Sequence, residues 1–440
     1  MARRGAAVAN LTVISATGDG SGVARHDGKV CLVEGALAGE EVDAVRIRGK
    51  ARYDVYRCET VTRSAPDRVE PRCAVYGRCG GCVLQHQSLA GQVADKQTAL
   101  LDKLQRLGGV APETVYDPIL GPEWHYRARA RLGVKFVMRK ERVLIGFRER
   151  RTPYLTDMAA CEILDARVAR LLPSLCDLIA RLSVMRQVPQ IEVAAGEGAV
   201  VLVLRHLAPL TGEDRTALSR FGDDHGIIWY LQQGGPDTIE PLLGSEVSLT
   251  YRMPDFSLSL GFSPALFSQV NPAVNQRLVS RVVELLEPQS GERIADLFCG
   301  IGNFTLALAR SGAQVFGYEG ELALVQWARD NATANALSHH ARCECVDLFA
   351  AEQVQYVLEA GFDKLLLDPP RTGADAVCRA LARQPVARVV YVSCNPATLA
   401  RDAATLTANG AYRLVGAGHV DMFPHTAHGE AVTLFEAIRD

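Results

Sequence analysis

One cysteine, Cys394, directly follows an apolar run at 389–392 and stands in the sequence Ser393-Cys394-Asn395-Pro396. The run predicts a buried strand, and ligand sites in open parallel sheets lie at the carboxyl ends of strands. A thiol at such a position can act as a nucleophile when it is ionised. Because free cysteine is only a few per cent thiolate at neutral pH, the site must also stabilise the anion.

Acidic residues occur at the ends of successive predicted strands. Asp296 precedes a glycine loop that contains Gly300 and Gly302, Glu319 ends the following strand, and Asp347 follows the third. A glycine loop alone is also found in nicotinamide and flavin sites, but a carboxylate beside a pyrophosphate is unfavourable. Adenosylmethionine has no phosphate and carries two cationic groups, and Glu319 could accept hydrogen bonds from both ribose hydroxyls. Each acid alone could be a helix cap or a surface group, but together they predict an adenosylmethionine site.

Two further strand ends supply candidate groups. Asp368 is followed by Pro369, Pro370 and Arg371, whereas amino-group methyltransferases have an aromatic residue after the two prolines, so we expect different chemistry. Glu430 precedes the last predicted strand and is the candidate base, although it could be an ordinary strand-edge carboxylate. The alternatives for the base are His425 and His428, each of which is also explained as a structural histidine of the turn.

A second group of cysteines has the spacing of a metal site. Cys73, Cys79 and Cys82 form C-x5-C-x2-C in a glycine-rich loop, and Cys161 is the best candidate for a fourth ligand. Four thiolates suit zinc or an iron–sulfur cluster equally well. The spacing differs from the C-x3-C-x2-C of radical adenosylmethionine enzymes, which argues against radical chemistry.

The elements that must position these residues divide the 440-residue chain into three predicted domains. Residues 1–66 contain short strands and turns typical of a small barrel of the OB type. Residues 67–260 mix strands and helices, with one helix over about 89–107 that we expect to pack on the catalytic domain and another over about 165–182. Residues 261–440 alternate strands and helices, which predicts an open, largely parallel α/β sheet of the Rossmann-like kind.

Composition and charge add three expectations. Net charge is −2, but ten basic and only three acidic residues lie between Glu123 and Arg151, which predicts a phosphate-binding face or, alternatively, a solvated hairpin. We find neither an apolar run long enough to span a membrane nor a signal-peptide pattern, so we expect no membrane association and a cytoplasmic location.

The elements 296–304, 368–373, 393–402 and 423–430, in this order, resemble the RNA uracil-C5 methyltransferase family over essentially the whole chain. The resemblance implies addition of the Cys394 thiolate to uracil C6, methyl transfer to C5, and removal of the C5 proton by Glu430. It also implies adenosylmethionine contacts from the residues that match family positions, namely Gln269, Phe298, Asn303, Glu319, Asp347 and Asp368.

Similarity to the rRNA branch of that family implies a [4Fe-4S] cluster on Cys73, Cys79, Cys82 and Cys161, with zinc as the alternative. Gly20 to Lys29 resemble part of a TRAM barrel, which implies an RNA-binding module over 1–66 and 23S rRNA as the partner. We expect a monomer and no obligate protein partner. Two alternatives are the same chemistry on tRNA, and a non-catalytic RNA-binding or ribosome-assembly protein.

Overall fold

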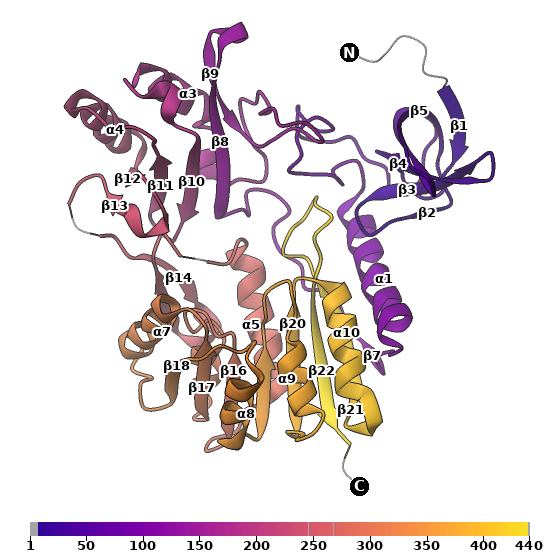
Figure 1. Cartoon of the computed structure of the whole chain (residues 1–440), viewed down its shortest axis with the longest axis vertical. Helices are drawn as coiled ribbons and strands as arrows, with labels where there is room; N and C mark the ends of the chain where they lie inside the picture. The colour runs from indigo at the N-terminus through magenta and orange to yellow at the C-terminus, as the bar shows by residue number, and fades with distance from the viewer. Residues whose placement is uncertain (1–7, 245, 267, 439–440) are drawn as a thin grey trace. The chain divides into compact units, whose positions relative to one another are not determined.

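The computed structural model describes residues 8–244, 246–266 and 268–438, in two compact units (Figure 1). The first unit holds residues up to Ala99 together with 147–156 and 423–428, and the second holds the remainder. Phe267, two residues before the predicted cofactor contact Gln269, lies outside the described residues.

The N-terminal strands of the first unit form one six-stranded sheet in the order β1-β5-β6-β4-β3-β2. Their bounds are β1 Val8–Thr12, β2 Ser15–Ala16, β3 Ser21–His26, β4 Lys29–Glu34, β5 Glu41–Gly49 and β6 Tyr53–Arg63. Alternate side chains point inward, and a core that includes Leu11, Val33 and Val42 is almost fully buried. The predicted β-rich N-terminal region is confirmed.

A second sheet belongs to the second unit and has the order β13-β12-β11-β10-β8-β9. Its strands are β8 Arg129–Val137, β9 Arg142–Gly146, β10 Gln190–Ala195, β11 Val200–Arg205, β12 Ile227–Gln232 and β13 Ile239–Pro241. The helices are α2 Ala166–Ala169, α3 Leu172–Arg181 and α4 Gly212–His225. The single helix predicted over about 165–182 is wrong, because Pro173 in the first turn of α3 cannot supply the N–H that would continue α2.

The C-terminal sheet has the order β18-β17-β16-β19-β20-β22-β21-β7, and β16 to β20 are parallel. Its strands are β16 Arg293–Leu297, β17 Gln314–Glu319, β18 Ala341–Cys345, β19 Lys364–Leu367, β20 Arg388–Ser393, β21 Tyr412–Val420, β22 Glu430–Ala437 and β7 Thr114–Val115. The hairpin of β14 (Leu249–Met253) and β15 (Leu258–Phe262) precedes it. The predicted α/β fold is confirmed.

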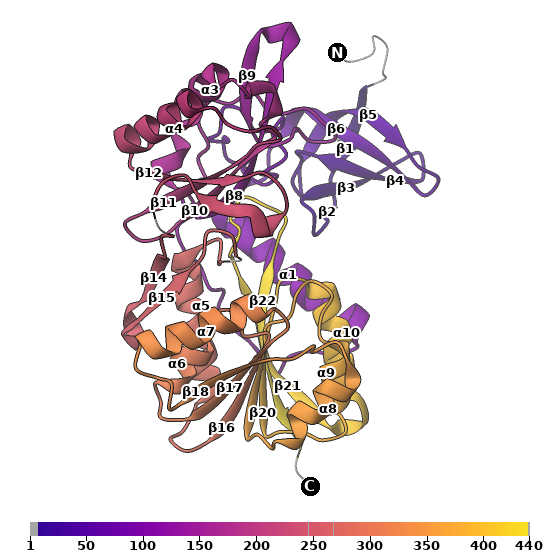
Figure 2. The ribbon, with the colours of Figure 1, turned by 60° about the vertical axis from the view of Figure 1, so that its left-hand side comes forward.

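Helices cover both faces of this C-terminal sheet, as Figure 2 shows. One side carries α5 Pro272–Leu286, α6 Thr305–Ala309 and α7 Leu322–Ala334, and the other carries α8 Ala351–Glu359, α9 Asp375–Leu381 and α10 Pro396–Thr407. The end of α1 (Leu89–Gly108) contributes Leu100 and Leu104 to the same core. Strands buried on both faces explain the continuous apolar runs in the sequence.

Candidate active site

A cavity of about 480 Å³ opens at the carboxyl ends of the parallel strands in the second unit. Every predicted cofactor-binding residue and both predicted catalytic residues line it: Gln269, Phe298, Asn303, Glu319, Asp347, Asp368, Cys394 and Glu430. They come from seven separate segments of the chain. Their convergence follows from the sheet order, because parallel strands end at one edge.

The loop after β16 has a backbone that few residues adopt. Gly300 and Gly302 have φ of 55° and 90°, and Phe298 also lies in the left-handed region at 67°. Glycine tolerates this conformation at little steric cost, whereas for Phe298 it stores strain that the fold must offset. The Phe298 ring lies 5.7 Å from that of Phe349, so two aromatic rings line the same part of the cavity.

Backbone N–H groups hold the two carboxylates at the next strand ends. Glu319 accepts hydrogen bonds from the amides of Gly300 (3.1 Å), Gly320 (2.7 Å) and Glu321 (3.2 Å). Asp347 accepts one from the amide of Phe349 at 3.0 Å. These bonds hold both carboxylates in place at the cavity, and their oxygens keep acceptor capacity for a ligand.

Asn303 belongs to a polar network that the sequence did not reveal. Its Oδ1 accepts hydrogen bonds from Tyr251 Oη (2.9 Å) and Asn275 Nδ2 (2.8 Å), and its Nδ2 donates to Asn275 Oδ1 (3.0 Å). Tyr251 lies on β14 and Asn275 on α5, far from the glycine loop in the chain. The only local signal was their polarity in otherwise apolar segments.

Asp296 lies behind the glycine loop rather than among the residues that line the cavity. Its side chain is fully buried and accepts a hydrogen bond from Thr305 Oγ1 at 2.6 Å. Burial raises the pKa of Asp296 to about 7. Through its hydrogen bond with Thr305, Asp296 connects the end of β16 to the start of α6, on either side of the glycine loop.

The two predicted catalytic residues meet where β20 and β22 pair. Ser393 is opposite Ala431 in the antiparallel register, so the next residues outward are Cys394 and Glu430. Burial raises the pKa of Glu430 to about 7. Burial, and then the carboxylates of Glu430 and Asp368, raise the pKa of Cys394 to about 11, and the cation of Arg371 acts in the opposite direction.

Asp368 completes this acidic corner. Burial, and then the charges of Glu430, Asp296 and Glu319, hold the pKa of Asp368 well above its usual range. Cys394 is therefore a thiol in the free protein, because burial and then the nearby acids disfavour its anion. A cationic group bound in the cavity would lower the pKa of Cys394 and favour its thiolate.

Cys299 is the other cysteine that lines the cavity, but its surroundings do not suit a nucleophile. It is buried, and contact with the Cys343 thiol, followed by burial, raises the pKa of Cys299 well above its usual value. Its sulfur packs closely against Gly317, where a Cβ would come within 2.9 Å. Cys299 is thus a packing residue beneath the glycine loop.

Comparison with known proteins shows which family the chain belongs to. A family model described as tRNA (Uracil-5-)-methyltransferase matches residues 88–438. The chain belongs to this family.

Two relatives in the family and one solved structure cover nearly the whole chain. The 23S rRNA (uracil(1939)-C(5))-methyltransferases RlmD of Nitrosospira multiformis and Thiobacillus denitrificans are each 47% identical, over 96% and 97% of this chain and 97% and 99% of their own. A crystal structure of Pyrococcus abyssi tRNA (uracil-54, C5)-methyltransferase in complex with S-adenosyl-L-homocysteine covers 97% of this chain and 100% of that one, with 25% identity and a TM-score of 0.74.

The predicted metal ligands of this family member are divided between the two units. Cys73, Cys79 and Cys82 lie in the first unit and Cys161 in the second. The Gly81 amide approaches Cys79 Sγ at 3.4 Å, and burial raises the pKa of the Cys79 thiol. Within the described ranges, no three histidine, cysteine or acidic side chains gather closely enough to hold a metal ion.

The two histidines that compete with Glu430 for the role of base lie in the first unit. His425 is buried, its amide donates to Gln92 Oε1 at 2.8 Å, and its carbonyl accepts from the amides of Val83 and Leu84. These bonds fit the structural alternative for His425. Among the described residues no helix is both long and apolar enough to span a membrane.

Proposed function

We propose that this protein transfers a methyl group from S-adenosylmethionine to C5 of a uridine in cytoplasmic 23S rRNA. The observation that carries the proposal is the common cavity of Cys394, Glu430 and the six predicted cofactor residues. The names of the RlmD relatives support rRNA as the substrate, and the complex of the P. abyssi enzyme supports the cofactor.

The cofactor side of the cavity would bind rather than react. Glu319 has acceptor capacity for the ribose hydroxyls, Asp347 for the adenine amino group, and the Phe298 and Phe349 rings can pack against the base. Hydrogen bonds from Tyr251 and Asn275 hold the side chain of Asn303 in one orientation at the cavity wall, where it can contact the cofactor. When bound, adenosylmethionine supplies an electrophilic methyl group.

On the catalytic side, Cys394 would add as a thiolate to C6 of uracil. Forming the S–C6 bond moves the ring electron pair to C5 and O4, which makes C5 nucleophilic. After C5 has gained the methyl group, Glu430 takes the C5 proton. The electrons of that C–H bond restore the C5–C6 double bond, and Cys394 leaves as a thiolate. The cation of Arg371 favours the Cys394 thiolate both when it adds to C6 and when it leaves at the end of the reaction.

For the cysteines we propose a [4Fe-4S] cluster on Cys73, Cys79, Cys82 and Cys161, with zinc as the alternative. Four cysteine thiolates are the usual ligands of such a cluster. The described side chains do not gather around one point. No step of the proposed reaction depends on the cluster. Anaerobically purified protein should be brown, with about four irons per chain. A colourless protein with one zinc per chain would contradict the iron–sulfur proposal.

The RNA-binding TRAM role of β1–β6 is also a proposal, supported by the single six-stranded sheet and by the Gly20–Lys29 motif. Deleting residues 1–66 should raise the RNA concentration needed for half-maximal methylation while leaving cofactor binding unchanged. An unchanged RNA requirement would contradict it.

The deciding experiment offers unmodified 23S rRNA and unmodified tRNA separately, with methyl-labelled cofactor. We expect label in 23S rRNA only, as 5-methyluridine after nuclease digestion. Label confined to tRNA would assign the same chemistry to the other substrate. Protein that binds rRNA but transfers no label would support the non-catalytic alternative.

A further inference from the structure

The sheet of β8–β13 has two faces with different surroundings. Helices α3 and α4 cover one of them: the Phe221 ring lies 6.0 Å from that of Trp229, and a Cβ at Gly222 would come within 2.5 Å of the Ile227 carbonyl. Trp229 therefore points to the helices, and so does Ile227, because residues two apart in a strand share a face. Their neighbours in β12, Tyr230 and Gln232, point to the opposite face.

The strand register extends that opposite face across four strands. Gln232 pairs with Arg205, Arg205 with Gln190, and Glu192, two residues from Gln190, with Arg131. Directly paired residues point to the same side of a sheet, as do residues two apart in one strand. We call the resulting set the arginine face: Arg129, Arg131, Gln190, Glu192, Arg205 and Gln232.

Charge on the arginine face is only partly balanced. Glu192 is its one acid, and it lies 3.0 Å from Arg131, 3.9 Å from Arg129 and 2.8 Å from Gln190 Nε2. Three guanidinium groups against one carboxylate leave a positive surplus. This surplus is complementary to a chain of phosphates.

Three polar atoms on the arginine face also have no hydrogen-bond partner among the described residues. They are Arg129 Nη1, Arg205 Nε and Gln232 Oε1, and each is buried from solvent. Buried polar atoms are nearly always paired, and each unpaired one costs about 1–3 kcal/mol. Two donors and one acceptor that remain unpaired on one positively charged face indicate a polar, anionic ligand.

The arginine face begins next to the catalytic cavity. Just before β8, the amide of Ala128 donates to the carbonyl of Val270 at 2.8 Å, and Gln269, the neighbour of Val270, lines the cavity. A chain whose reacting base lies in the cavity could therefore continue along β8. This continuity favours the substrate itself as the ligand.

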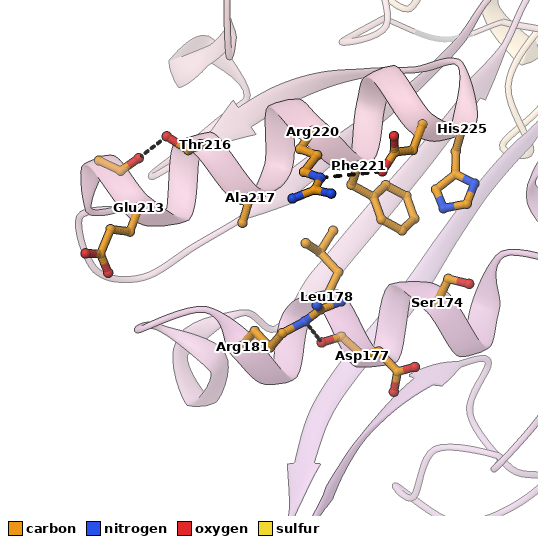
Figure 3. A pocket seen from close by; sticks show the side chains of 12 residues that line it. Ser174, Asp177, Leu178, Arg181, Glu213, Thr216, Ala217, Arg220, Phe221 and His225 are labelled. Atoms are coloured by element: carbon orange, nitrogen blue, oxygen red, sulfur yellow. Dashed lines mark hydrogen bonds and ion pairs between the residues drawn. The ribbon is translucent and has the colours of Figure 1, made fainter.

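The helix side of the same sheet provides a contrast, shown in Figure 3. A hollow of about 910 Å³ lies between α3 and α4, and its charged residues are two arginines against three acids, namely Arg181, Arg220, Asp177, Glu213 and Asp224. Both arginines already have partners: Arg220 lies 3.9 Å from Asp224, and Arg181 Nε donates to the Asp177 carbonyl at 3.1 Å. This side should repel phosphates.

We propose that the arginine face binds the phosphodiester backbone of the RNA next to the methylated uridine. The inference rests on the proposed function, because it takes the RNA substrate as the ligand. Guanidinium groups pair with phosphate oxygens in a bidentate geometry, and Gln232 Oε1 can accept a hydrogen bond from a ribose hydroxyl or a base amine. The basic segment predicted from the sequence supplies Arg129 and Arg131, and β10–β12 supply the other four residues.

The test compares Arg131→Gln, Arg205→Gln and their double variant with Arg220→Gln, which removes the same charge from the helix side. The probe is a fluorescein-labelled, unmodified fragment of 23S rRNA, titrated at several salt concentrations. We expect the double variant to weaken binding roughly tenfold or more, and to reduce the salt slope by about 0.7 for each lost phosphate contact. Arg220→Gln should match the wild type, and Arg131→Lys should recover most of the affinity.

Kinetics separate this proposal from the function on which it rests. The double variant should raise KM for RNA, with kcat and KM for adenosylmethionine within about twofold of wild type. Arg131 has a side chain that is 70% exposed, so its single variant keeps the test available if Arg205→Gln unfolds, which circular dichroism would detect. Affinity and salt slope equal to those of Arg220→Gln would overturn the proposal. Failure of the wild type to methylate any RNA would overturn the proposed function instead.

Discussion

The two sides of the catalytic cavity hold their carboxylates in opposite ways. On the cofactor side, Glu319 and Asp347 accept hydrogen bonds from backbone amides. On the catalytic side, the carboxyl groups of Asp368 and Glu430 accept none from other described residues, and burial raises the pKa of both. On one side hydrogen bonds hold the carboxylates in place, and on the other burial raises the pKa of Glu430 to about 7, so that it can exchange a proton near neutral pH.

This difference follows from where the residues lie. The carboxylates of Glu319 and Asp347 are next to loops whose amides donate hydrogen bonds to them, so their positions are set before any ligand arrives. The catalytic carboxylates stand at ends of strands whose amides are used in the sheet, so they lose water without gaining donors. A pKa near 7 suits Glu430 to take up and release a proton at physiological pH.

Removing the nucleophile should have the largest effect. We expect Cys394→Ser to lower methyl transfer by about 10³-fold or more, because a hydroxyl is a far weaker nucleophile at neutral pH. Incorporation of labelled methyl into 23S rRNA measures it. Cys176→Ser on α3 is the matched control and should retain wild-type activity. If Cys394→Ser stayed within tenfold of wild type, another group would have to be the nucleophile.

Removing the base should stop the reaction at a later stage. We expect Glu430→Gln to lower turnover by about 10²–10⁴-fold while a covalent protein–RNA adduct accumulates, since addition and methyl transfer precede proton removal. Denaturing gels with labelled RNA detect the adduct. Glu344→Gln, an exposed carboxylate at the end of β18, should form none. Full turnover without adduct would show that Glu430 is not the base.

On the cofactor side, a smaller effect confined to binding is expected. Glu319→Gln places an amide where three backbone N–H groups point, and we expect the Kd for adenosylmethionine to rise about 10- to 100-fold. Turnover at saturating cofactor should fall much less. Calorimetric titration measures the Kd, with Glu321→Gln as the exposed control. A large loss of turnover at unchanged affinity would mean that Glu319 acts in the reaction and not in cofactor binding.

The sequence predicted the sheet and the line of strand-end residues because both depend on local patterns. Apolar runs mark β16, β17, β19 and β20, and the residue after each run must lie at the sheet edge. Cys394 and Glu319 could therefore be placed without any structure. The break between α2 and α3 does not show in the apolar pattern, which runs on through both helices, and only Pro173 in the first turn of α3 marks it.

Properties that depend on long-range packing could not be predicted. The network of Tyr251, Asn275 and Asn303 joins three distant segments, and no periodicity connects them. Charge counting found Arg129 and Arg131 but not Arg205, which reaches the same face only through strand register. The raised pKa of Cys394 likewise arises from burial and from acids on other strands.

The smallest expected effect is on the alkylation rate of Cys394, which directly tests whether Glu430 titrates beside it. The carboxylate of Glu430 raises the pKa of Cys394 above its usual value, and ionisation of Glu430 itself is centred near pH 7. In the free protein we expect Glu430→Gln to speed alkylation of Cys394 by iodoacetamide by about tenfold near pH 8.5, where Glu430 is ionised in the wild type. Well below pH 7 the ratio should approach one, because the wild-type carboxyl is then neutral too.

Arg371→Gln should act in the other direction, since the guanidinium lowers the pKa of Cys394. Peptide mass spectrometry assigns the alkylated cysteine, and Glu344→Gln serves as the control for charge at a distance. A ratio between Glu430→Gln and wild type that stays constant across this pH range would mean that Glu430 does not titrate beside Cys394. Glu430 would then keep one charge state across this range and could not exchange a proton near neutral pH.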